Sequence, residues 1–361
     1  MKKFPLVIGM CCVAISKLGA VILLDTGDPA VNTTAPAGPL LNSGWQYEGD
    51  WGGNLGTPVS PNFFISAAHV GQAGSGLVFQ NVSYPTVGSF SLPGSDLLIW
   101  KIAGSFPQFA PLFTARDEVG QHLVVIGRGT RRGAERYLNG TLRGWDWAKD
   151  TEGTRRWGEN DVTAIVPYQG HDLLAADFDQ HIAPNDRPNE AHLSSGDSGG
   201  AIFLNVGGMW KFGGINSFVD DLYSAPTAGC DFTSAIFDAR GFYTRDGSDP
   251  SMFVQISGPD PVPTAFYASR ISSELAWICS VIADPHVGSE ADRVTLTFWR
   301  LIASPNDIVY EVKQSPDLVS WSPATTQEEI VSTAGDLELV KVKVDPGTSD
   351  HLFLRLSVTR P

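Results

Sequence analysis

The stretch that decides the fold is Ser194–Phe203, SSGDSGGAIF, in which three serines and three glycines precede an apolar run. Most clusters of glycine and serine are ordinary turns, because glycine tolerates positive φ and serine bonds its own backbone. The order of residues here favours a more specific interpretation. Gly196 and Gly200 stand two residues before and after Ser198, so the backbone can turn sharply and approach another molecule. The amides of Gly196 and Ser198 can then converge on an oxyanion, which makes Ser198 a candidate nucleophile.

A serine hydroxyl is a weak nucleophile and needs a general base and an orienting acid from elsewhere in the chain. His69 ends the apolar segment FFISAAH, and histidine is the usual general base near neutral pH. Asp96 precedes the apolar run LLIWKI, where a buried carboxylate needs a hydrogen-bond donor such as an imidazole N–H. No other Asp or Glu lies between His69 and Asp96. Each residue alone has a structural interpretation, but together with Ser198 they predict a catalytic set.

Three segments carry a resemblance to a known family. FFISAAHV contains His69, DLLIWKI contains Asp96 and GDSGGAIF contains Ser198. In that order they resemble the trypsin/chymotrypsin family of serine endopeptidases. The segments between them are similar as well: 52–69 resembles the family's second and third strands, and 212–218 resembles the strand that binds the substrate backbone.

The resemblance covers about residues 22–283 and implies an all-β fold. This fold is a trypsin-like double six-stranded antiparallel β-barrel with a C-terminal helix. The sequence agrees, because short apolar runs between 44 and 218 are separated by Gly, Pro, Asn and Asp. Small and apolar residues have helical spacing over 263–282, and FYASRISSELAWI within it resembles the family's closing helix. We expect three regions: a signal peptide at 1–20, a protease-like domain at 21–283 and a small β-sandwich domain at 284–361.

The resemblance implies hydrolysis of peptide bonds through an acyl-enzyme on Ser198. His69 takes the proton of the attacking hydroxyl and returns it to the leaving amine, while Asp96 orients His69. The amides of Gly196 and Ser198 form the implied oxyanion hole. The implied substrate is a protein or peptide, and no cofactor is implied. A catalytically inactive binding or adhesion module is the alternative; an esterase fits less well, because its usual order is Ser, Asp, His.

Departures from the family affect the predicted specificity. His192 stands six residues before Ser198, at the position of the family's pocket base, and it is not the acid that selects Lys or Arg. Val219 stands where many members have glycine. We expect substrate contacts from four residues: His192, Ser217, Phe218 and Val219. The predicted preference is for small or apolar residues at the cleaved bond.

Activation in this family involves a new N-terminus. The aspartate before the nucleophile pairs with a newly exposed N-terminal amine, and Asp197 occupies that position here. The usual IVGG start is missing. Cleavage after Ala20 makes Val21 the new terminus, at a family-like distance before His69. We therefore predict that signal removal, or a nearby cut, supplies the amine for Asp197.

The N-terminal segment and the overall charge bear on the compartment and the partners. In residues 1–20, MKKFPLVIGMCCVAISKLGA, two lysines precede an apolar run and small residues follow it, which is typical of a secretory signal peptide. No later segment has eighteen uninterrupted apolar residues, so no membrane span is expected. We expect a secreted, periplasmic or cell-surface protein. The formal net charge of −14 disfavours nucleic acid as a partner, because such binding depends on neutralising phosphates.

The sequence offers little evidence for cross-links by disulfide or metal. Two cysteines follow the predicted signal peptide, Cys230 and Cys279. A secreted chain can pair them, but Cys279 can equally be a small buried apolar residue. No metal is expected, since HExxH and CxxC spacings are absent. The weaker alternative is a metal or calcium site in one polar region: His171, Asp172, Asp177, Asp179, His181 and His192.

Two segments lie outside the family pattern. Residues 220–262 resemble an insertion near the pocket. Residues 284–361 alternate polar and apolar positions, as half-buried strands do, and contain YEVKQSPDLVSWSPA. That motif resembles small β-modules at the ends of secreted or surface proteins of some bacteria. A plain stabilising domain and a module that docks to a cell surface or to substrate are equally open interpretations.

Overall fold

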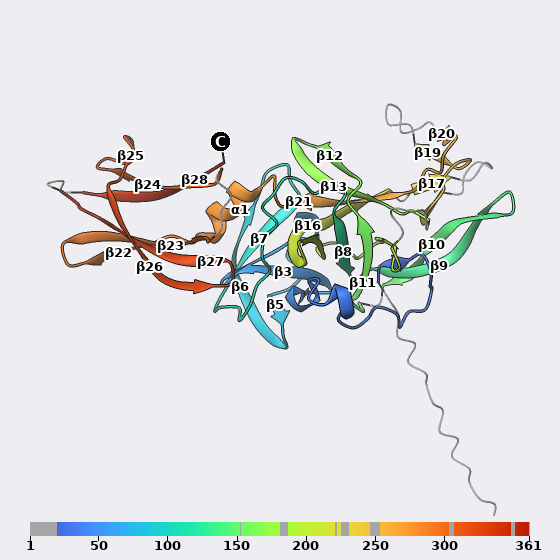
Figure 1. Cartoon of the computed structure of the whole chain (residues 1–361), viewed down its shortest axis with the longest axis horizontal. Coiled ribbons are helices and arrows are strands. Elements are labelled where there is room, and N and C mark those ends of the chain that lie inside the picture. The colour runs from blue at the N-terminus through green and yellow to red at the C-terminus, as the bar shows by residue number, and fades with distance from the viewer. Residues whose placement is uncertain are drawn as a thin grey trace, which may run out of the picture.

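The computed structural model describes residues 20–151, 153–180, 187–220, 222–224, 231–245, 253–302, 307–347 and 351–360. Residues 1–19 of the predicted signal peptide, together with His181 and Cys230, lie outside the described residues. Two β-barrels occupy the middle of the molecule, the C-terminal module lies at one end, and a further sheet lies at the other (Figure 1).

The first barrel is a closed ring of six antiparallel strands in the order β2-β3-β4-β7-β6-β5. The strands are β2 (Gly49–Trp51), β3 (Asn54–Ser60), β4 (Phe63–Ala67), β5 (Gly76–Phe79), β6 (Val82–Ser91) and β7 (Leu97–Ile102). The continuous apolar run of β7 reflects burial on both faces. Leu98 and Trp100 pack with Trp51 inside this barrel, while Leu97 and Ile99 pack in a larger core shared with the second barrel.

The second barrel is built from a sheet of seven antiparallel strands in the order β11-β8-β15-β16-β21-β13-β12. The strands are β8 (His122–Gly127), β11 (Arg156–Asp161), β12 (Ala164–Tyr168), β13 (His171–Asp177), β15 (Ala201–Val206), β16 (Met209–Val219) and β21 (Ala265–Arg270). The side-chain amide of Asn160 on β11 donates to the backbone oxygen of Asp177 on β13, at 2.8 Å. The sheet therefore curls until its first and sixth strands meet, and β12 extends β13 as a hairpin. The predicted all-β, double-barrel architecture is confirmed.

The segment expected to be helical over 263–282 is two elements. β21 is a strand that pairs with β16 on one side and β13 on the other, and α1 (Leu275–Ile282) begins only after it. Phe266 and Ala268 on β21 are fully buried in the second barrel, because neighbouring strands cover this strand. The small and apolar residues of β21 are followed closely in the sequence by those of α1. Their combined spacing matches that of a single longer helix, which is why the sequence predicted one.

The segment 220–262 contributes a separate sheet beside the second barrel. Its described strands are β17 (Leu222–Ser224), β18 (Asp231–Ile236), β19 (Tyr243–Arg245) and β20 (Phe253–Gln255). β18 pairs with β10 (Thr141–Thr151), which forms a long hairpin with β9 (Thr130–Leu138). The six strands lie at one end of the molecule (Figure 1). The expected insertion is therefore a folded extension of the β9–β10 hairpin.

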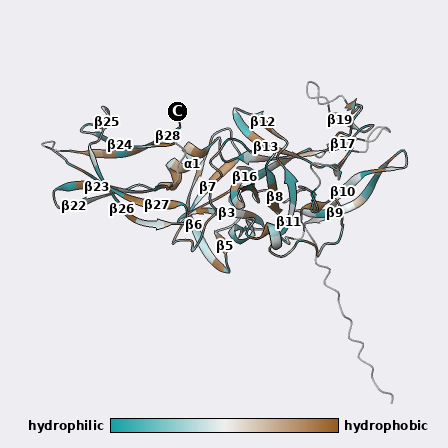
Figure 2. Cartoon of the chain, in the orientation of Figure 1, coloured by the Kyte–Doolittle hydropathy of each residue, from teal (hydrophilic) through white to brown (hydrophobic). Residues whose placement is uncertain are grey.

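The C-terminal module consists of two antiparallel sheets. One contains β22 (His286–Glu290), β23 (Arg293–Leu301), β26 (Thr326–Ala334) and β27 (Leu337–Val344); the other contains β24 (Val309–Ser315), β25 (Ser322–Pro323) and β28 (Phe353–Thr359). Leu301, Ile308 and Leu337 of this module are buried in the same core as Ile278 and Ile282 of α1. Figure 2 shows α1 as an apolar segment between the module and the barrels. The module thus packs on the barrels through α1, although its strands form sheets of their own.

Cys279 on α1 is a free thiol that is buried in this shared core. Burial raises the pKa of the thiol to about 11, although its hydrogen bond with Tyr310 of the module acts in the opposite direction. A buried cysteine of this kind behaves as a small apolar residue. Of the two interpretations of Cys279, the structure has the buried thiol, and the other cysteine, Cys230, lies outside the described residues.

Candidate active site

His69 and Asp96 lie at neighbouring ends of two paired strands. His69 belongs to a short 3₁₀ turn, Ala68–Val70, directly after β4, and Asp96 directly precedes β7. Because β4 and β7 are antiparallel and pair Ala67 with Leu97, the two residues meet at one edge of the first barrel. The Asp96 carboxylate accepts one bond from the His69 backbone N–H at 2.8 Å and a second from His69 Nδ1 at 2.7 Å.

This contact determines the electronic state of His69. The hydrogen bond to Asp96 raises the pKa of His69, although partial burial acts in the opposite direction. Since the carboxylate only accepts, Nδ1 carries a proton and the neutral ring keeps its lone pair on Nε2. The Asp96 side chain is 8% exposed and that of His69 is 43% exposed, so the imidazole remains accessible while the carboxylate is covered.

Ser198 lies in the loop between β14 (Ala191–His192) and β15, and this loop packs against the first barrel. Gly199 has φ +80°, and a Cβ there would lie 2.7 Å from the backbone oxygen of Leu55 and 2.5 Å from Ser66 Oγ. Only glycine fits this approach to β3 and β4. The loop is therefore held directly beside β4, the strand that leads to His69.

The backbone amides near Ser198 are available to a ligand. Gly196 has φ +94°, and the turn around it uses the N–H groups of Asp197 and Gly200, which donate to Ser194 and Asp197. Among the described residues, no acceptor is bonded to the amides of Gly196 or Ser198. Unpaired N–H groups on a serine and on the glycine two residues before it match the donor set of an oxyanion hole.

A cavity of about 200 Å³ opens beside Ser198. Its lining consists of Trp147, Leu193, Ser194, Ser195, Asp197, Ser198, Asn216, Ser217, Phe218 and Val219. The ring of Phe218 stacks on that of His69, with centroids 6.4 Å apart. The cavity and the His69–Asp96 pair therefore share one wall. Within the described residues Ser198 Oγ forms no hydrogen bond, so the structure joins His69 to Asp96 but does not bond His69 Nε2 to Ser198.

The structure places three of the four expected substrate contacts in the cavity lining. Ser217, Phe218 and Val219 line it from the end of β16. His192 is not part of the lining. It is fully buried behind the loop, where its ring contacts Phe178 and Nδ1 lies 2.6 Å from the backbone oxygen of Leu193. Burial lowers the pKa of His192 to about 4, which is typical of a neutral core histidine.

Two lining residues were not among the expected substrate contacts. Trp147 comes from β10, far from the three recognised segments, and no motif marks it. Asn216 holds the loop from below, because its side-chain amide donates to the backbone oxygen of Ile126 at 2.8 Å and to that of Asp197 at 3.1 Å. Such contacts depend on how the strands are folded together and cannot be read from local sequence.

Asp197 is a buried carboxylate surrounded by donors. It accepts bonds from the backbone N–H of Gly129 at 2.6 Å and of Ser194 at 2.7 Å, and from the Ser194 hydroxyl at 3.0 Å. The backbone N–H of Val21 is a further donor. Burial raises the pKa of Asp197 to about 6 in spite of these bonds. Val21 arrives here because β1 (Ile22–Leu23) pairs with β14 beside the loop.

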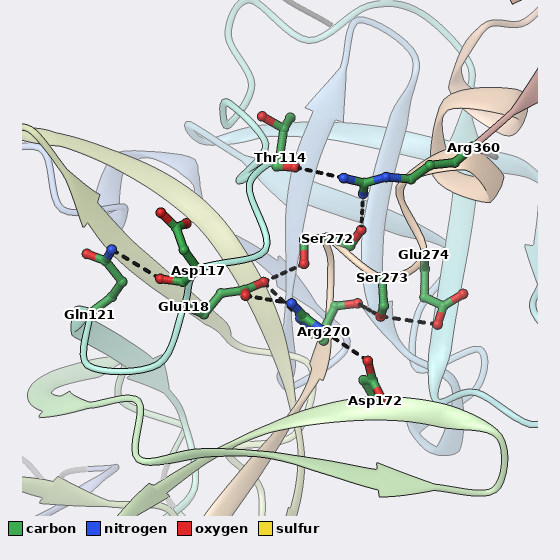
Figure 3. Close-up of polar contacts among 10 residues, drawn as sticks. All are labelled: Thr114, Asp117, Glu118, Gln121, Asp172, Arg270, Ser272, Ser273, Glu274 and Arg360. Atoms are coloured by element: carbon green, nitrogen blue, oxygen red, sulfur yellow. Dashed lines mark hydrogen bonds and ion pairs between the residues drawn. The ribbon is translucent and has the colours of Figure 1, made fainter. Parts of the chain in front are cut away.

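Side chains of the polar region that was considered as a metal site form hydrogen bonds and ion pairs with other residues. Asp172 pairs with Arg270, whose guanidinium also binds Glu118 (Figure 3). His171 bonds Glu274, and His192 is buried apart from both. Within the part of the chain that the structure describes, no group of three or more His, Cys, Asp or Glu side chains has the arrangement of a metal site.

Solved structures that are similar to this chain include several serine proteases. Kallikrein-related peptidase 10 is similar at 15% identity over 68% of this chain and 98% of its own, with a TM-score of 0.38. An inactive mutant form of Rv3671c from M. tuberculosis is 12% identical over 71% and 98% of the two chains, with a TM-score of 0.37. The secreted serine protease VesC from Vibrio cholerae is 11% identical over 85% and 65%, also at 0.37.

No family model matches the sequence, and no curated protein matches it. Because the structural similarities are low in identity and in TM-score, they carry no argument about activity, which must come from this chain's own residues. Among the described residues, no helix has the length and apolarity needed to cross a membrane.

The raised pKa of His69 leads to a test that does not depend on activity. We expect the imidazole of His69 to titrate above its ordinary value of 6.5, because Asp96 stabilises the charged ring. Asp96→Asn should lower this pKa by about one unit or more, since it removes a charge-assisted hydrogen bond. Histidine NMR titration of both proteins measures the shift. An unchanged pKa in Asp96→Asn would show that the two side chains are not coupled.

Proposed function

We propose that this protein is a serine endopeptidase that hydrolyses peptide bonds through Ser198, His69 and Asp96. The observation that carries the proposal is the hydrogen-bonded His69–Asp96 pair beside a cavity that contains Ser198. The unpaired amides of Gly196 and Ser198 support it, because acyl transfer requires stabilisation of a developing oxyanion.

The proposed reaction assigns one task to each side chain. Ser198 Oγ attacks the substrate carbonyl, and His69 Nε2 accepts the hydroxyl proton as the bond forms. The oxyanion is bound by the amides of Gly196 and Ser198. His69 then protonates the leaving amine, which leaves an acyl-enzyme on Ser198 that water hydrolyses by the same steps. Asp96 stays ionised and stabilises the imidazolium in each half-reaction.

The nucleophile can be tested by covalent labelling. We expect a fluorophosphonate probe to form a single adduct on Ser198, detected by intact mass and peptide mapping, and Ser198→Ala to form none. Asp96→Asn should slow the labelling by about 10⁴-fold, because the base is left in the wrong tautomer. Ser195→Ala is the matched control, since Ser195 lies in the same loop and cavity wall but has no assigned chemical role.

Absence of any adduct on folded protein that begins at Val21 would contradict the proposal. It would favour the alternative, a protease-like fold that serves as a binding or adhesion module. The proposal also includes a signal peptide at 1–20 and secretion or display at the cell surface. Either location fits a peptidase that acts on external proteins.

We also propose that cleavage between Ala20 and Val21 activates the site. Two observations support this position. Val21 has φ +55°, a left-handed conformation that a β-branched residue adopts only under strain, at about 1–3 kcal/mol. Its backbone N–H lies close enough to the buried Asp197 carboxylate to act against the rise in the pKa of that carboxyl group. Cleavage removes the preceding carbonyl and thus the strain, and it places an ammonium against a carboxylate that otherwise has only neutral donors.

The effect of the new N-terminus can be measured directly. We expect protein that begins at Val21 to react with the fluorophosphonate at least about tenfold faster than protein that retains Ala20, because a buried charge pair fixes the Ser198 loop. The advantage should disappear above the pKa of the amine and in Asp197→Asn. Equal rates for both N-termini would contradict this mechanism, while leaving the assignment of Ser198 intact.

The cavity supports a preference for apolar residues at the cleaved bond. Trp147, Leu193, Phe218 and Val219 provide apolar walls. Asp197 is the one acidic residue of the lining, and its carboxylate is occupied by backbone donors and by Ser194. A lysine or arginine side chain therefore meets no free counter-ion in this cavity.

Peptide-library profiling tests this specificity. We expect cleavage after small or apolar residues to exceed cleavage after Lys or Arg by at least about a hundredfold in kcat/KM, because a buried unpaired cation costs several kcal/mol. Val219→Gly should widen the cavity and increase cleavage after large aromatic residues, while Val219→Ala should have a smaller effect in the same direction. Dominant cleavage after basic residues would overturn the assignment.

A further inference from the structure

His171, at the start of β13, forms hydrogen bonds through both of its ring nitrogens, and one of them reaches the first barrel. Nδ1 lies 3.0 Å from Glu274 Oε1, next to the start of α1. Nε2 lies 3.0 Å from the backbone oxygen of Pro93, in the turn that joins β6 to β7. Pro93 stands three residues before Asp96. The catalytic pair proposed above involves neither contact.

The two partners of His171 determine its protonation state. A backbone oxygen and a carboxylate oxygen are both acceptors, so both ring nitrogens must donate. A neutral imidazole has one N–H and keeps one of these bonds, whereas the imidazolium keeps both. The pair of contacts at 3.0 Å is therefore complete only when His171 is positively charged.

The charged groups around His171 favour the imidazolium. The hydrogen bond to Glu274 raises the pKa of His171, and the charge of Asp172 acts in the same direction, while burial opposes them. Asp172 is shared with Arg270, whose guanidinium is held by the buried Glu118 (Figure 3). The 92–95 turn facing Nε2 contains no titratable side chain. The His171 side chain is 18% exposed, so it exchanges protons with solvent.

The turn held by His171 is short and closely packed. Ser95 donates its backbone N–H to Leu92 at 3.1 Å, which closes the turn. Gly94 has φ +83°, and a Cβ there would lie 3.2 Å from His171 Nε2. Because Asp96 follows directly, a displacement of Pro93 is transmitted to the carboxylate that holds both the backbone and the ring of His69.

We propose that protonated His171 is a positioning residue that links the Pro93–Asp96 turn to the second barrel and keeps the His69–Asp96 pair aligned. Deprotonation breaks one of the two links, so the site loses activity as pH rises through the pKa of His171. This inference rests on the proposed peptidase function. The two histidines affect activity in opposite directions, because His171 must be protonated to position the site, whereas His69 must be neutral to act as a base.

The test is the pH dependence of kcat/KM in protein that begins at Val21. We expect an alkaline decrease of about tenfold that follows the titration of His171, which corresponds to loss of one charge-assisted hydrogen bond. His171→Gln cannot titrate and should lack this decrease. Glu274→Gln should move it to lower pH, because the imidazolium loses its anionic partner. Gln169→Asn, in the same hairpin, should behave like the natural protein.

Titration of the Val21 amine also lowers activity at high pH, and the variants separate the two effects. A decrease caused by the amine persists in His171→Gln and keeps its position in Glu274→Gln. The proposal is overturned if neither variant changes the decrease in kcat/KM at high pH. If either variant folds poorly, the other still decides the question. His171→Gln should abolish the decrease at high pH and Glu274→Gln should shift it to lower pH, and these are independent outcomes.

A spectroscopic signal provides a result that does not require turnover. The proton on His69 Nδ1, bonded to Asp96 at 2.7 Å, should give a far-downfield NMR resonance. We expect this resonance to broaden as His171 loses its proton, whereas in His171→Gln it should change only with the titration of His69 itself. An unchanged resonance above the pKa of His171 overturns the proposal. Absence of hydrolysis with a normal spectrum would instead show that the peptidase proposal has failed.

Discussion

The burial of the Asp197 carboxylate is the constraint on which the arrangement of this site depends. Water cannot solvate this carboxylate, so the protein surrounds it with backbone donors from Gly129 and Ser194 and with the N–H of Val21. These donors come from three separate segments of the chain. A Cβ at Gly127 would lie 2.1 Å from the carboxylate, so that strand must also carry glycine. Satisfying one buried charge thereby brings the N-terminal strand and the Ser198 loop together.

A second set of contacts acts across the two barrels. Asp96 binds His69 within the first barrel, and Gly199 brings the Ser198 loop of the second barrel against Ser66 of the first. His171 adds a link that depends on charge, because both of its partners are acceptors. The relative position of His69 and Ser198 thus depends on contacts between the barrels as much as on either barrel alone.

The C-terminal module is joined to this framework by its packing. Leu301 and Leu337 are buried in one core with Ile278 of α1, and Cys279 forms its hydrogen bond with Tyr310 of the module. Arg360 near the end of the chain donates to the backbone oxygen of Thr114 (Figure 3). A module that shares its core with the barrels contributes to their stability, which favours the stabilising interpretation of the tail over an independent docking domain.

The sequence by itself determined the features that depend on local chemistry. The GDSGG loop, the histidine after an apolar strand and the aspartate before LLIWKI carried the family resemblance that implied the double barrel, and the structure joins His69 to Asp96 by a hydrogen bond. Tertiary structure alone decided the rest. A buried central strand and the following helix shared one spacing of apolar residues, so β21 was expected to be helical. His192 was expected in the cavity, yet Trp147 and Asn216 line it, because a side chain's exposure depends on which distant strands cover it.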